Sequence, residues 1–274
     1  MRIWANTLVK NEDRFLWFSV MSVINQVDKI LIWDTGSTDA TISQIQKIKK
    51  LYPDKVDFRQ VGNVTAESFT RMRDEMLQKT LADWVILVDG DEVWWDEEIQ
   101  KVIKLIRTQG NELESIVNIY YNLVGDIYHY QEKSAGMYEI DDQKGHLNIR
   151  ALNTKIPGLH VANPHPQDAY FDKFGIPIQQ RDPKKRIKLS GPNYFHLTHL
   201  VRSTLQNNEV PKRSMKLKYE IGNRLPYDFY YPEVFFRPKP IIVPDPWQKM
   251  ERSYLLRSLI ETPFKKIRRI FLDV

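Results

Sequence analysis

The chain has 274 residues, with 40 Lys and Arg, 35 Asp and Glu, and no Cys. This length is enough for one large domain or two small ones with a hydrophobic core. The absence of Cys excludes a disulfide scaffold, a thiolate zinc site, an iron–sulfur cluster and a cysteine nucleophile. No apolar run approaches the roughly 18 residues of a membrane-spanning helix, and the N-terminus does not resemble a signal peptide. We therefore expect a cytoplasmic protein that is soluble or peripherally bound to a membrane.

The net charge of +5 is unevenly distributed along the chain. Residues 1–200 contain 25 basic and 27 acidic residues, whereas residues 201–274 contain 15 and 8, a local excess of +7. Such a basic tail suits nucleic acid, anionic lipid or a phosphorylated substrate, and a simple solvated surface is the common alternative.

Strand-like and helix-like patterns alternate through the first part of the chain. Strands are expected at residues 3–9, 29–33, 56–61 and 84–88. Apolar residues at helical spacing follow at residues 16–27, 42–48, 69–76 and 99–106, and Gly110 is expected to end the last of these helices. This alternation predicts a largely parallel sheet, in which ligands bind outside the carboxyl ends of the strands.

The second part of the chain has a weaker pattern. Beyond residues 115–123 the pattern loosens into a Tyr- and His-rich stretch at 126–138 and a loop-like region at 155–188. Six of the 15 prolines fall in residues 226–246, so this segment is expected to pack as an extended arm. A short helix at residues 247–260 and a basic end at 264–271 complete the expectation.

Two carboxylates, Asp89 and Asp91, follow the strand expected at residues 84–88. Carboxylates so close repel each other unless a cation neutralises them. Mg²⁺ and Mn²⁺ are held by one or two carboxylates together with substrate phosphates, so the pair is typical of a metal–diphosphate site. The alternative is an acidic turn before a helix, whose positive N-terminal end favours Asp and Glu.

Four motifs at or near the strand ends occur in a specific order. Residues 8–12 read LVKNE, residues 34–41 DTGSTDAT, residues 71–74 RMRD and residues 83–92 DWVILVDGDE. Their order and spacing, over about residues 1–100, resemble the family 2 glycosyltransferases of GT-A fold, of the NEE/DTGSTD type. The resemblance implies an α/β protein with a Rossmann-like, mostly parallel mixed sheet flanked by helices. It implies a catalytic domain at residues 1–200, with the nucleotide-sugar half at 1–110 and the acceptor half at 111–200, before a C-terminal extension at 201–274.

The resemblance also implies roles for individual residues. Asp34 would accept a hydrogen bond from the nucleobase, Arg73 would hold the nucleotide, and Asp89 would contact the ribose or the donor sugar. Asp91 would bind the divalent ion that bridges the diphosphate. The other residues expected in the nucleotide-sugar site are Val9, Asn11, Glu12 and Gly90. Many family members have two adjacent acids at the second strand end, but here Thr35 follows Asp34, which leaves the nucleobase unassigned.

Transfer with inversion needs a base that takes the proton of the acceptor hydroxyl. In similar enzymes this base is an Asp or Glu after the D-x-D strand. Asp168 is the first candidate here, and Glu132 and Asp126 are the next. Relatives of this type often carry a Gly-x-x-His-Glu sequence in this region, whereas Val161 stands at the place of the Glu.

Two further predictions concern residues near the D-x-D motif. His196 would supply a further metal ligand, and an imidazole ligand favours Mn²⁺ over Mg²⁺; the alternative is a structural histidine. Trp94 and Trp95 follow the motif and would flank the donor sugar, although aromatic residues are mainly core residues.

The resulting hypothesis is a metal-dependent, inverting glycosyltransferase that uses Mn²⁺ or Mg²⁺ and a UDP-, GDP- or dTDP-linked sugar. Its acceptor would be a carbohydrate or a lipid-linked molecule, and no nucleic-acid partner is expected. The basic end either rests on the cytoplasmic face of an anionic membrane or docks as a surface helix. Two other functions stay open: a sugar-nucleotide nucleotidyltransferase, which usually has a Gly-rich basic loop after its first strand, and a non-enzymatic protein that binds through its basic tail.

Overall fold

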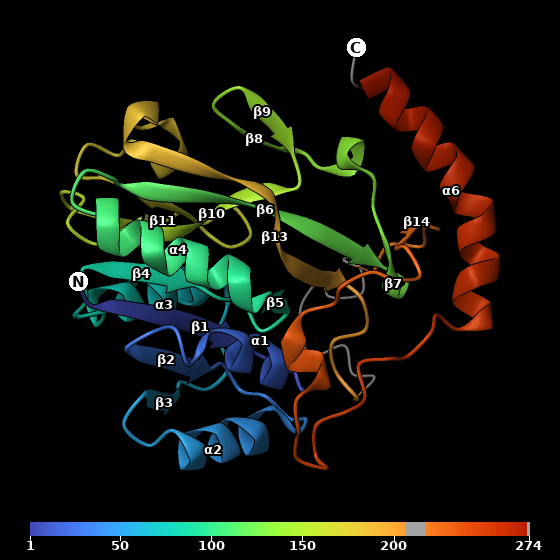
Figure 1. Cartoon of the computed structure of the whole chain (residues 1–274), viewed down its shortest axis with the longest axis horizontal. Helices are drawn as coiled ribbons and strands as arrows, with labels where there is room; N and C mark the ends of the chain where they lie inside the picture. The colour runs from blue at the N-terminus through green and yellow to red at the C-terminus, as the bar shows by residue number, and fades with distance from the viewer. Residues whose placement is uncertain (206–216, 273–274) are drawn as a thin grey trace.

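The computed structural model describes residues 1–205 and 217–272. Figure 1 shows a central sheet with helices on its faces and a long C-terminal helix standing at one side. The first part of the chain forms nine elements: β1 (Ile3–Val9), α1 (Leu16–Val23), β2 (Lys29–Asp34), α2 (Thr41–Leu51), β3 (Val56–Gln60), α3 (Ala66–Gln78), β4 (Trp84–Leu87), β5 (Glu92–Trp94) and α4 (Asp96–Gln109).

The second part is richer in strands and short helical turns. In chain order its elements are β6 (Ser115–Val124), β7 (Asp126–Tyr130), η1 (Lys133–Ala135), β8 (Tyr138–Ile140), β9 (Gln143–Gly145), β10 (Leu147–Asn153), β11 (His160–Ala162), β12 (Ala169–Phe171), η2 (Ile178–Gln180), η3 (Pro183–Lys185), β13 (Arg186–His199), β14 (Asn223–Arg224), η4 (Glu233–Phe236) and α6 (Arg252–Leu272).

The described residues form one ten-stranded mixed sheet with β1 near its middle. Its main path runs β14-β7-β6-β10-β4-β1-β2-β3, and β13 pairs with both β6 and β5. The strands β3, β2, β1 and β4 are parallel, as their helical crossovers require. From β10 onward the pairing becomes mixed, because β10 runs antiparallel to β4 and β6 while β13 runs parallel to β6. The expected mixed α/β sheet flanked by helices is confirmed.

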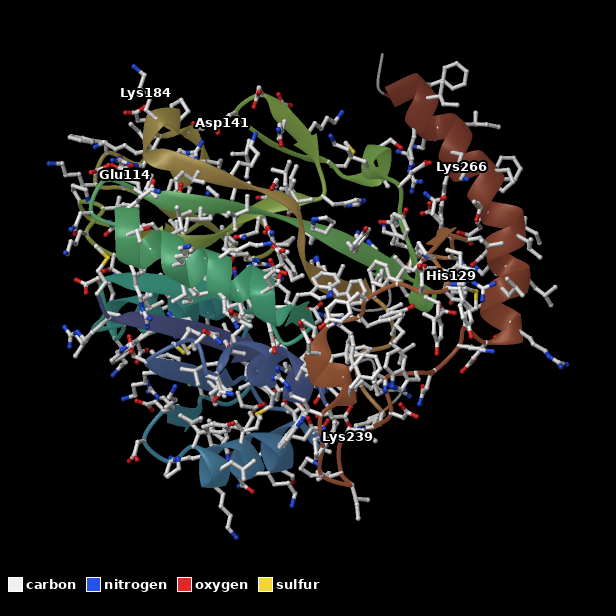
Figure 2. The ribbon with its side chains drawn as sticks, viewed as in Figure 1. Glu114, His129, Asp141, Lys184, Lys239 and Lys266 are labelled. Atoms are coloured by element: carbon white, nitrogen blue, oxygen red, sulfur yellow. The ribbon has the colours of Figure 1, made fainter. Side chains whose placement is uncertain are left out.

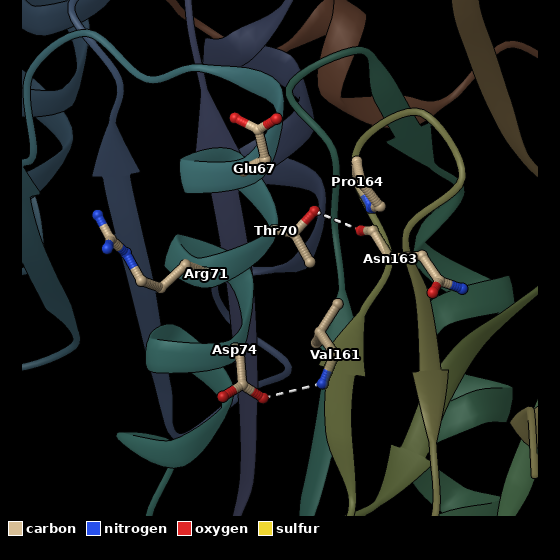
Figure 3. A pocket seen from close by; sticks show the side chains of 7 residues that line it. All are labelled: Glu67, Thr70, Arg71, Asp74, Val161, Asn163 and Pro164. Atoms are coloured by element: carbon tan, nitrogen blue, oxygen red, sulfur yellow. Dashed lines mark hydrogen bonds between the residues drawn. The ribbon is translucent and has the colours of Figure 1, made fainter. Parts of the chain in front are cut away.

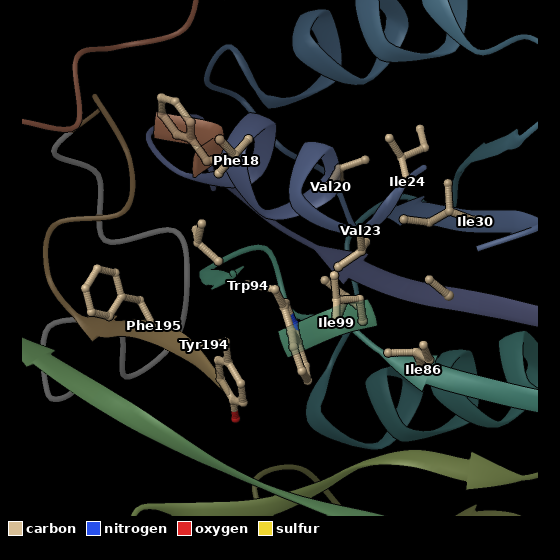
Figure 4. Packing of buried hydrophobic residues seen from close by; sticks show 14 of the residues in the cluster. Phe18, Val20, Val23, Ile24, Ile30, Ile86, Trp94, Ile99, Tyr194 and Phe195 are labelled. Carbon is tan, nitrogen blue, oxygen red and sulfur yellow. The ribbon is translucent and has the colours of Figure 1, made fainter. Parts of the chain in front are cut away.

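The main core joins the helices to one face of this sheet. Figure 4 shows Phe18 and Val20 of α1 near Trp94 and Tyr194, whose rings stack with centroids 4.8 Å apart. The expectation that Trp94 and Trp95 flank the donor sugar is wrong, since both side chains are buried among these core residues. Trp95 is fixed further by a 2.8 Å hydrogen bond from Nε1 to the carbonyl oxygen of Tyr230.

The C-terminal extension packs against the same core. β14 pairs with β7, and Leu225, Val234, Phe235 and Val243 belong to the main apolar cluster. The extended arm is confirmed, because η4 is the only helical or strand element in residues 226–246. A domain boundary at residue 200 stays a prediction.

The expected C-terminal helix at residues 247–260 is wrong at both ends. α6 begins at Arg252 and continues through Pro263 and the basic segment to Leu272. The turns after Pro263 are held by Lys265, whose Nζ donates to the carbonyl oxygen of Tyr219 at 2.7 Å, and by Arg269, whose Nη1 lies 2.6 Å from Glu220 Oε1. Within the described ranges, no helix is both long and apolar enough to cross a bilayer.

Candidate functional site

Polar residues after β1, β2 and β3 meet at the carboxyl edge of the parallel strands. The Oδ1 atom of Asn11 accepts a 2.7 Å hydrogen bond from the backbone N–H of Thr38, and the N–H of Asn11 donates to Ser37 Oγ at 2.8 Å. Lys10 Nζ donates to Asn63 Oδ1 at 2.8 Å, which ties the loop after β1 to the loop after β3. Contacts therefore hold these three strand ends together.

Asp34 ends β2, and only one of its two carboxylate oxygens has hydrogen-bond partners among the described residues. Its Oδ2 accepts 2.9 Å hydrogen bonds from the N–H groups of Gly36 and Ser37, and the positive φ of Gly36 (88°) permits this tight turn. Its Oδ1 is buried and has no hydrogen-bond partner among the described residues. Leaving a buried acceptor unpaired costs about 1–3 kcal/mol, so a hydrogen-bond donor at this oxygen would stabilise the folded state.

Thr35 stands where many relatives have a second acid, and it has a structural role. Its side chain is buried, and its Oγ1 donates a 3.0 Å hydrogen bond to the carbonyl oxygen of Val9. Thr35 therefore links β2 to β1, and the site has no second carboxylate at this position.

The loop after β4 packs tightly against the end of β1. A Cβ atom at Gly90 would lie 3.0 Å from both Glu12 Cγ and Val9 Cγ1. The side chain of Val9 is thus part of the packing under this loop. Only glycine lets the backbone between Asp89 and Asp91 approach β1 this closely.

Asp89 is paired with two arginines from different elements. Its Oδ1 lies 3.2 Å from Arg73 Nη2 on α3, and its Oδ2 lies 3.0 Å from Arg150 Nη2 on β10. Although burial opposes ionisation, these two guanidinium groups hold the pKa of Asp89 below its usual value. Asp89 is therefore a carboxylate in an environment that already supplies positive charge.

Arg73 also joins Asp89 to Asp168, the first candidate for the base. Arg73 Nη1 lies 3.4 Å from Asp168 Oδ2, and His165 Nδ1 lies 2.8 Å from Asp168 Oδ1. Burial raises the pKa of Asp168, but the hydrogen bond from His165 and the charge of Arg73 outweigh it and lower that pKa. The structure thus brings Asp168, as an ionised carboxylate, to Arg73, one of the residues expected to bind the nucleotide-sugar.

A β-bulge positions Arg150. The register of β10 against β6 shifts between Ile149 and Ala151, and such a bulge re-aims the side chain of the extra residue. Arg150 also pairs with Glu92, whose carboxyl group is fully buried. Burial raises the pKa of Glu92 well above its usual value, against the opposing charge of Arg150.

Asp91 pairs with Arg202, which follows β13. Arg202 Nη1 lies 2.5 Å from Asp91 Oδ2 and 3.1 Å from Glu12 Oε1, so one guanidinium lies between two buried carboxylates. The neighbouring Thr204 donates its N–H to Asp13 Oδ1 at 2.8 Å. The residues around Arg202 are therefore fixed to the loop after β1.

His196 lies beside Asp91, as the metal hypothesis requires. Its Nε2 is 3.8 Å from Asp91 Oδ2, and burial lowers the pKa of His196 to about 4, so its imidazole is neutral at pH 7. Its Nδ1 is buried and has no hydrogen-bond partner within residues 1–205 and 217–272. A carboxylate with a neutral imidazole is a donor pair that suits Mn²⁺. No group of three or more His, Asp or Glu in the described residues could hold a metal ion.

The two other candidates for the base lie among contacts to the C-terminal extension. Glu132 Oε1 is 3.1 Å from Arg269 Nη1 on α6. Asp126 contacts His129 at 2.6 Å and accepts a 3.1 Å hydrogen bond from the N–H of Met250. Figure 2 shows His129 beside α6. Both carboxylates thus contact α6, the residues that lead into it, or β7.

A cavity of about 370 Å³ lies between α3 and β11. In Figure 3, Asp74 accepts a 2.8 Å hydrogen bond from the N–H of Val161, and Thr70 donates to the carbonyl oxygen of Asn163 at 2.7 Å. A second, smaller cavity is lined by Arg73, Asp89 and Tyr170, among others. The second cavity touches the residues expected to bind the nucleotide-sugar, and the first does not.

Sequence reasoning did not find Arg150 or Arg202. Arg150 stands in an ordinary strand pattern, and Arg202 was counted only as part of the basic tail. Their partners, Glu92 and Asp91, lie 58 and 111 residues away in the chain. A buried Arg is rare unless paired, but burial is visible only after folding.

Comparison with known proteins assigns the chain to a family. The family model described as "Glycosyl transferase family 2" matches residues 7–163, more than half of the chain. The mostly parallel mixed sheet flanked by helices is the GT-A fold that the sequence motifs predict. The chain belongs to glycosyl transferase family 2.

Individual proteins similar to this chain share little sequence identity with it. A TPR repeat-containing protein of Synechococcus elongatus is 24% identical over 182 residues, which cover 66% of this chain and 38% of that protein. The chain thus spans less than two fifths of this curated relative. Among solved structures, S. aureus TarS 1-349 is 13% identical, covering 72% of this chain and 61% of that one, with a TM-score of 0.45. Glucosyl-3-phosphoglycerate synthase from Mycobacterium tuberculosis, in complex with phosphoglyceric acid, is 14% identical over 72% of each chain, with a TM-score of 0.42.

Proposed function

We propose that this protein transfers a sugar from a nucleotide-sugar to an acceptor hydroxyl group, with inversion at the anomeric carbon. Its membership of glycosyl transferase family 2 supports the reaction class. One observation supports the proposal further. Asp34, Asp89 and Asp91 lie at one edge of the sheet, and a buried oxygen of Asp34 has no hydrogen-bond partner among the described residues.

In this proposal the donor lies along the carboxyl ends of β2, β1 and β4. Asp34 Oδ1 accepts a hydrogen bond from an N–H group of the nucleobase, which gives that buried oxygen its missing partner. Arg73 lies close enough to Asp89 to hold the ribose or the diphosphate beside it. UDP-, GDP- and dTDP-linked sugars all present the required nucleobase N–H.

Asp91 and His196 are the residues that would hold a divalent ion, with phosphate oxygens of the donor completing its ligands. Mn²⁺ is favoured because one donor is an imidazole nitrogen. When bound, such an ion offsets the negative charge that develops on the departing nucleoside diphosphate. In the structure, the guanidinium of Arg202 contacts the same oxygen of Asp91 that faces His196. When an ion binds, the guanidinium must therefore leave this oxygen or share it with the ion.

Asp168 is the proposed base. It removes the proton of the acceptor hydroxyl as that oxygen forms a bond to the anomeric carbon. The bond from this carbon to the phosphate oxygen breaks on the opposite face, and the nucleoside diphosphate leaves with the electron pair. Arg73 and His165 keep Asp168 ionised and oriented before the proton arrives.

The test is the release of nucleoside diphosphate from UDP-, GDP- and dTDP-linked sugars, with MnCl₂ and with EDTA, using water as the acceptor. We expect release from one donor class, dependent on Mn²⁺, with the freed sugar in the inverted anomeric form by NMR. Asp168→Asn should lower the rate by 10²-fold or more, while Asp57→Asn, an exposed site on β3, should not. The absence of release from every donor would contradict the proposal.

A further inference from the structure

The outward face of α6 carries exposed apolar residues along its whole length. They recur every three or four positions: Leu255, Leu256, Leu259, Ile260, Phe264, Ile267, Ile270 and Phe271. Basic residues, among them Arg252 and Lys266, are exposed on the same helix. The side chains of Ile260, Phe264 and Phe271 are 68%, 71% and 75% exposed. At this spacing the residues form one continuous stripe on the helix surface.

The inward face of α6 is polar. Thr262 Oγ1 accepts a 2.8 Å hydrogen bond from the N–H of Ile221, and Lys265 Nζ donates to the carbonyl oxygen of Tyr219 at 2.7 Å. Arg269 Nη1 lies 2.6 Å from Glu220 Oε1. A helix on a globular protein normally turns its apolar stripe to the core. Here polar contacts dock the helix and leave the stripe outside.

The charge of α6 indicates what this stripe meets. Its 21 residues include six Lys or Arg and one acid, Glu261, a net charge of +5. Lys266 and Arg268 are exposed next to the apolar stripe, and Figure 2 shows Lys266 on the helix. A second copy of this chain would bring two such cationic helices together. An anionic lipid surface instead offers apolar chains for the stripe and opposite charge for its borders.

We propose that α6 binds an anionic lipid bilayer, lying in the plane of the interface with its apolar stripe among the acyl chains. The helix does not need to cross the bilayer for this, and basic residues at its borders contact lipid phosphates. The membrane contact stands independently of the proposed transferase activity.

The position of α6 relates the membrane surface to the candidate site. In Figure 1, β1 runs from the N-terminus toward the side of the molecule on which α6 stands. Arg269 on α6 contacts Glu132, whose carbonyl oxygen accepts a 3.0 Å hydrogen bond from His146 Nε2. His146 packs on Tyr120, and Tyr120 packs edge-to-face on His196. If the proposed function holds, this arrangement places the site near the bilayer and favours a lipid-linked acceptor.

Vesicle sedimentation with the full chain tests the membrane contact. The vesicles are phosphatidylcholine alone and phosphatidylcholine with 30% phosphatidylglycerol. We expect binding to the anionic vesicles, weakened at least tenfold by 0.5 M NaCl, because salt screens exposed charges. The triple variant Ile260→Ser, Phe264→Ser and Ile267→Ser should lose at least tenfold in affinity, and Lys266→Glu with Arg268→Glu should lose binding to anionic vesicles.

A matched control removes three exposed apolar side chains elsewhere: Leu51→Ser, Leu81→Ser and Ile241→Ser. It should bind vesicles like the wild type, and circular dichroism and melting temperature should show that both triple variants fold. Equal binding by the α6 triple variant would overturn the inference, as would no binding by the wild type. So would a dimer in light scattering that the α6 triple variant makes monomeric, because a second copy would then cover the stripe. Nucleoside diphosphate release without vesicles tests the transferase separately.

Discussion

In the proposed function, Asp34 recognises the donor through one carboxylate oxygen, Oδ1, which has no hydrogen-bond partner among the described residues. Asp34→Asn keeps an oxygen that can accept from Gly36 and Ser37 but replaces the other oxygen with an amide donor. A hydrogen bond to a charged group contributes about 1.5–3 kcal/mol, so the Kd for the preferred nucleotide should rise by roughly 10- to 150-fold. Isothermal titration calorimetry measures this change.

The control for Asp34 is the neighbouring Thr35→Ser, which keeps the hydroxyl that bonds to Val9. Its affinity for nucleotide should stay within about twofold of the wild type. Equal affinities of Asp34→Asn and the wild type would show that Asp34 serves only the turn after β2.

The guanidinium of Arg202 lies between the carboxylates of Asp91 and Glu12. Removing one partner from a buried ion pair destabilises a protein by about 3–5 kcal/mol. Arg202→Ala should therefore lower the free energy of unfolding by about that amount in EDTA, measured by urea denaturation. Since the variant removes the competing guanidinium from Asp91, Mn²⁺ should restore part of the loss.

Arg202→Lys is the matched variant, because it keeps a positive charge at this position. It should be less destabilised in EDTA and should gain less from Mn²⁺ than Arg202→Ala. If Mn²⁺ stabilises neither variant more than the wild type, Arg202 does not compete with a metal ion at Asp91.

At the scale of the element, α6 depends on an ion pair that titrates. Although burial opposes ionisation, hydrogen bonds from Arg269 and Gln131 lower the pKa of Glu220. Because the pKa of Glu220 is lower in the folded state than its unfolded value of about 4.5, the stabilisation from ionised Glu220 is fully present above about pH 4.5. This stabilisation is lost as the pH falls through the folded-state pKa. Docking of α6 should therefore weaken in acid.

Glu220→Gln tests this dependence on pH. At pH 7 the variant should melt at a lower temperature than the wild type, and between pH 5 and pH 3.5 its melting temperature should fall less steeply. Arg268→Gln is the control, because Arg268 is an exposed basic residue on the same helix. Parallel pH profiles for Glu220→Gln and the wild type would show that this pair does not hold α6.

The elements differ in how far their sequences predict them. The parallel strands and α4 follow from local patterns, since Ile99, Val102, Ile103 and Ile106 are all buried as their spacing predicts. The length of α6 was missed because Pro263 is an exposed helix residue that local rules read as a stop. The spacing of the apolar residues in the sequence indicates the stripe on α6. Which face of the helix docks on the protein depends on contacts with residues 219–221, which lie far back in the chain.

At the scale of the whole molecule, the site combines predictable and unpredictable parts. Asp34 ends β2, and Asp89 and Asp91 stand in the turn after β4, so their place at one edge follows from a parallel sheet. Arg150 lies on β10 and Arg202 follows β13, and no local pattern indicates the mixed pairing of these two strands. The positive charge around the D-x-D motif, and the place of Asp168 beside Arg73, therefore required the folded structure.

The central claim is that the carboxyl edge of the sheet binds a nucleotide together with a divalent ion. The most direct measurement is the melting temperature of the wild type and of Asp91→Ala with UDP, GDP, dTDP and CDP, each with Mn²⁺ or EDTA. Specific binding to the folded state raises stability by mass action, by about 2.7 kcal/mol at a ligand concentration of 100 times Kd. We predict that one nucleotide raises the wild-type melting temperature only with Mn²⁺, and that Asp91→Ala shows no such rise. No rise with any nucleotide, or an equal rise in both proteins, would contradict the account.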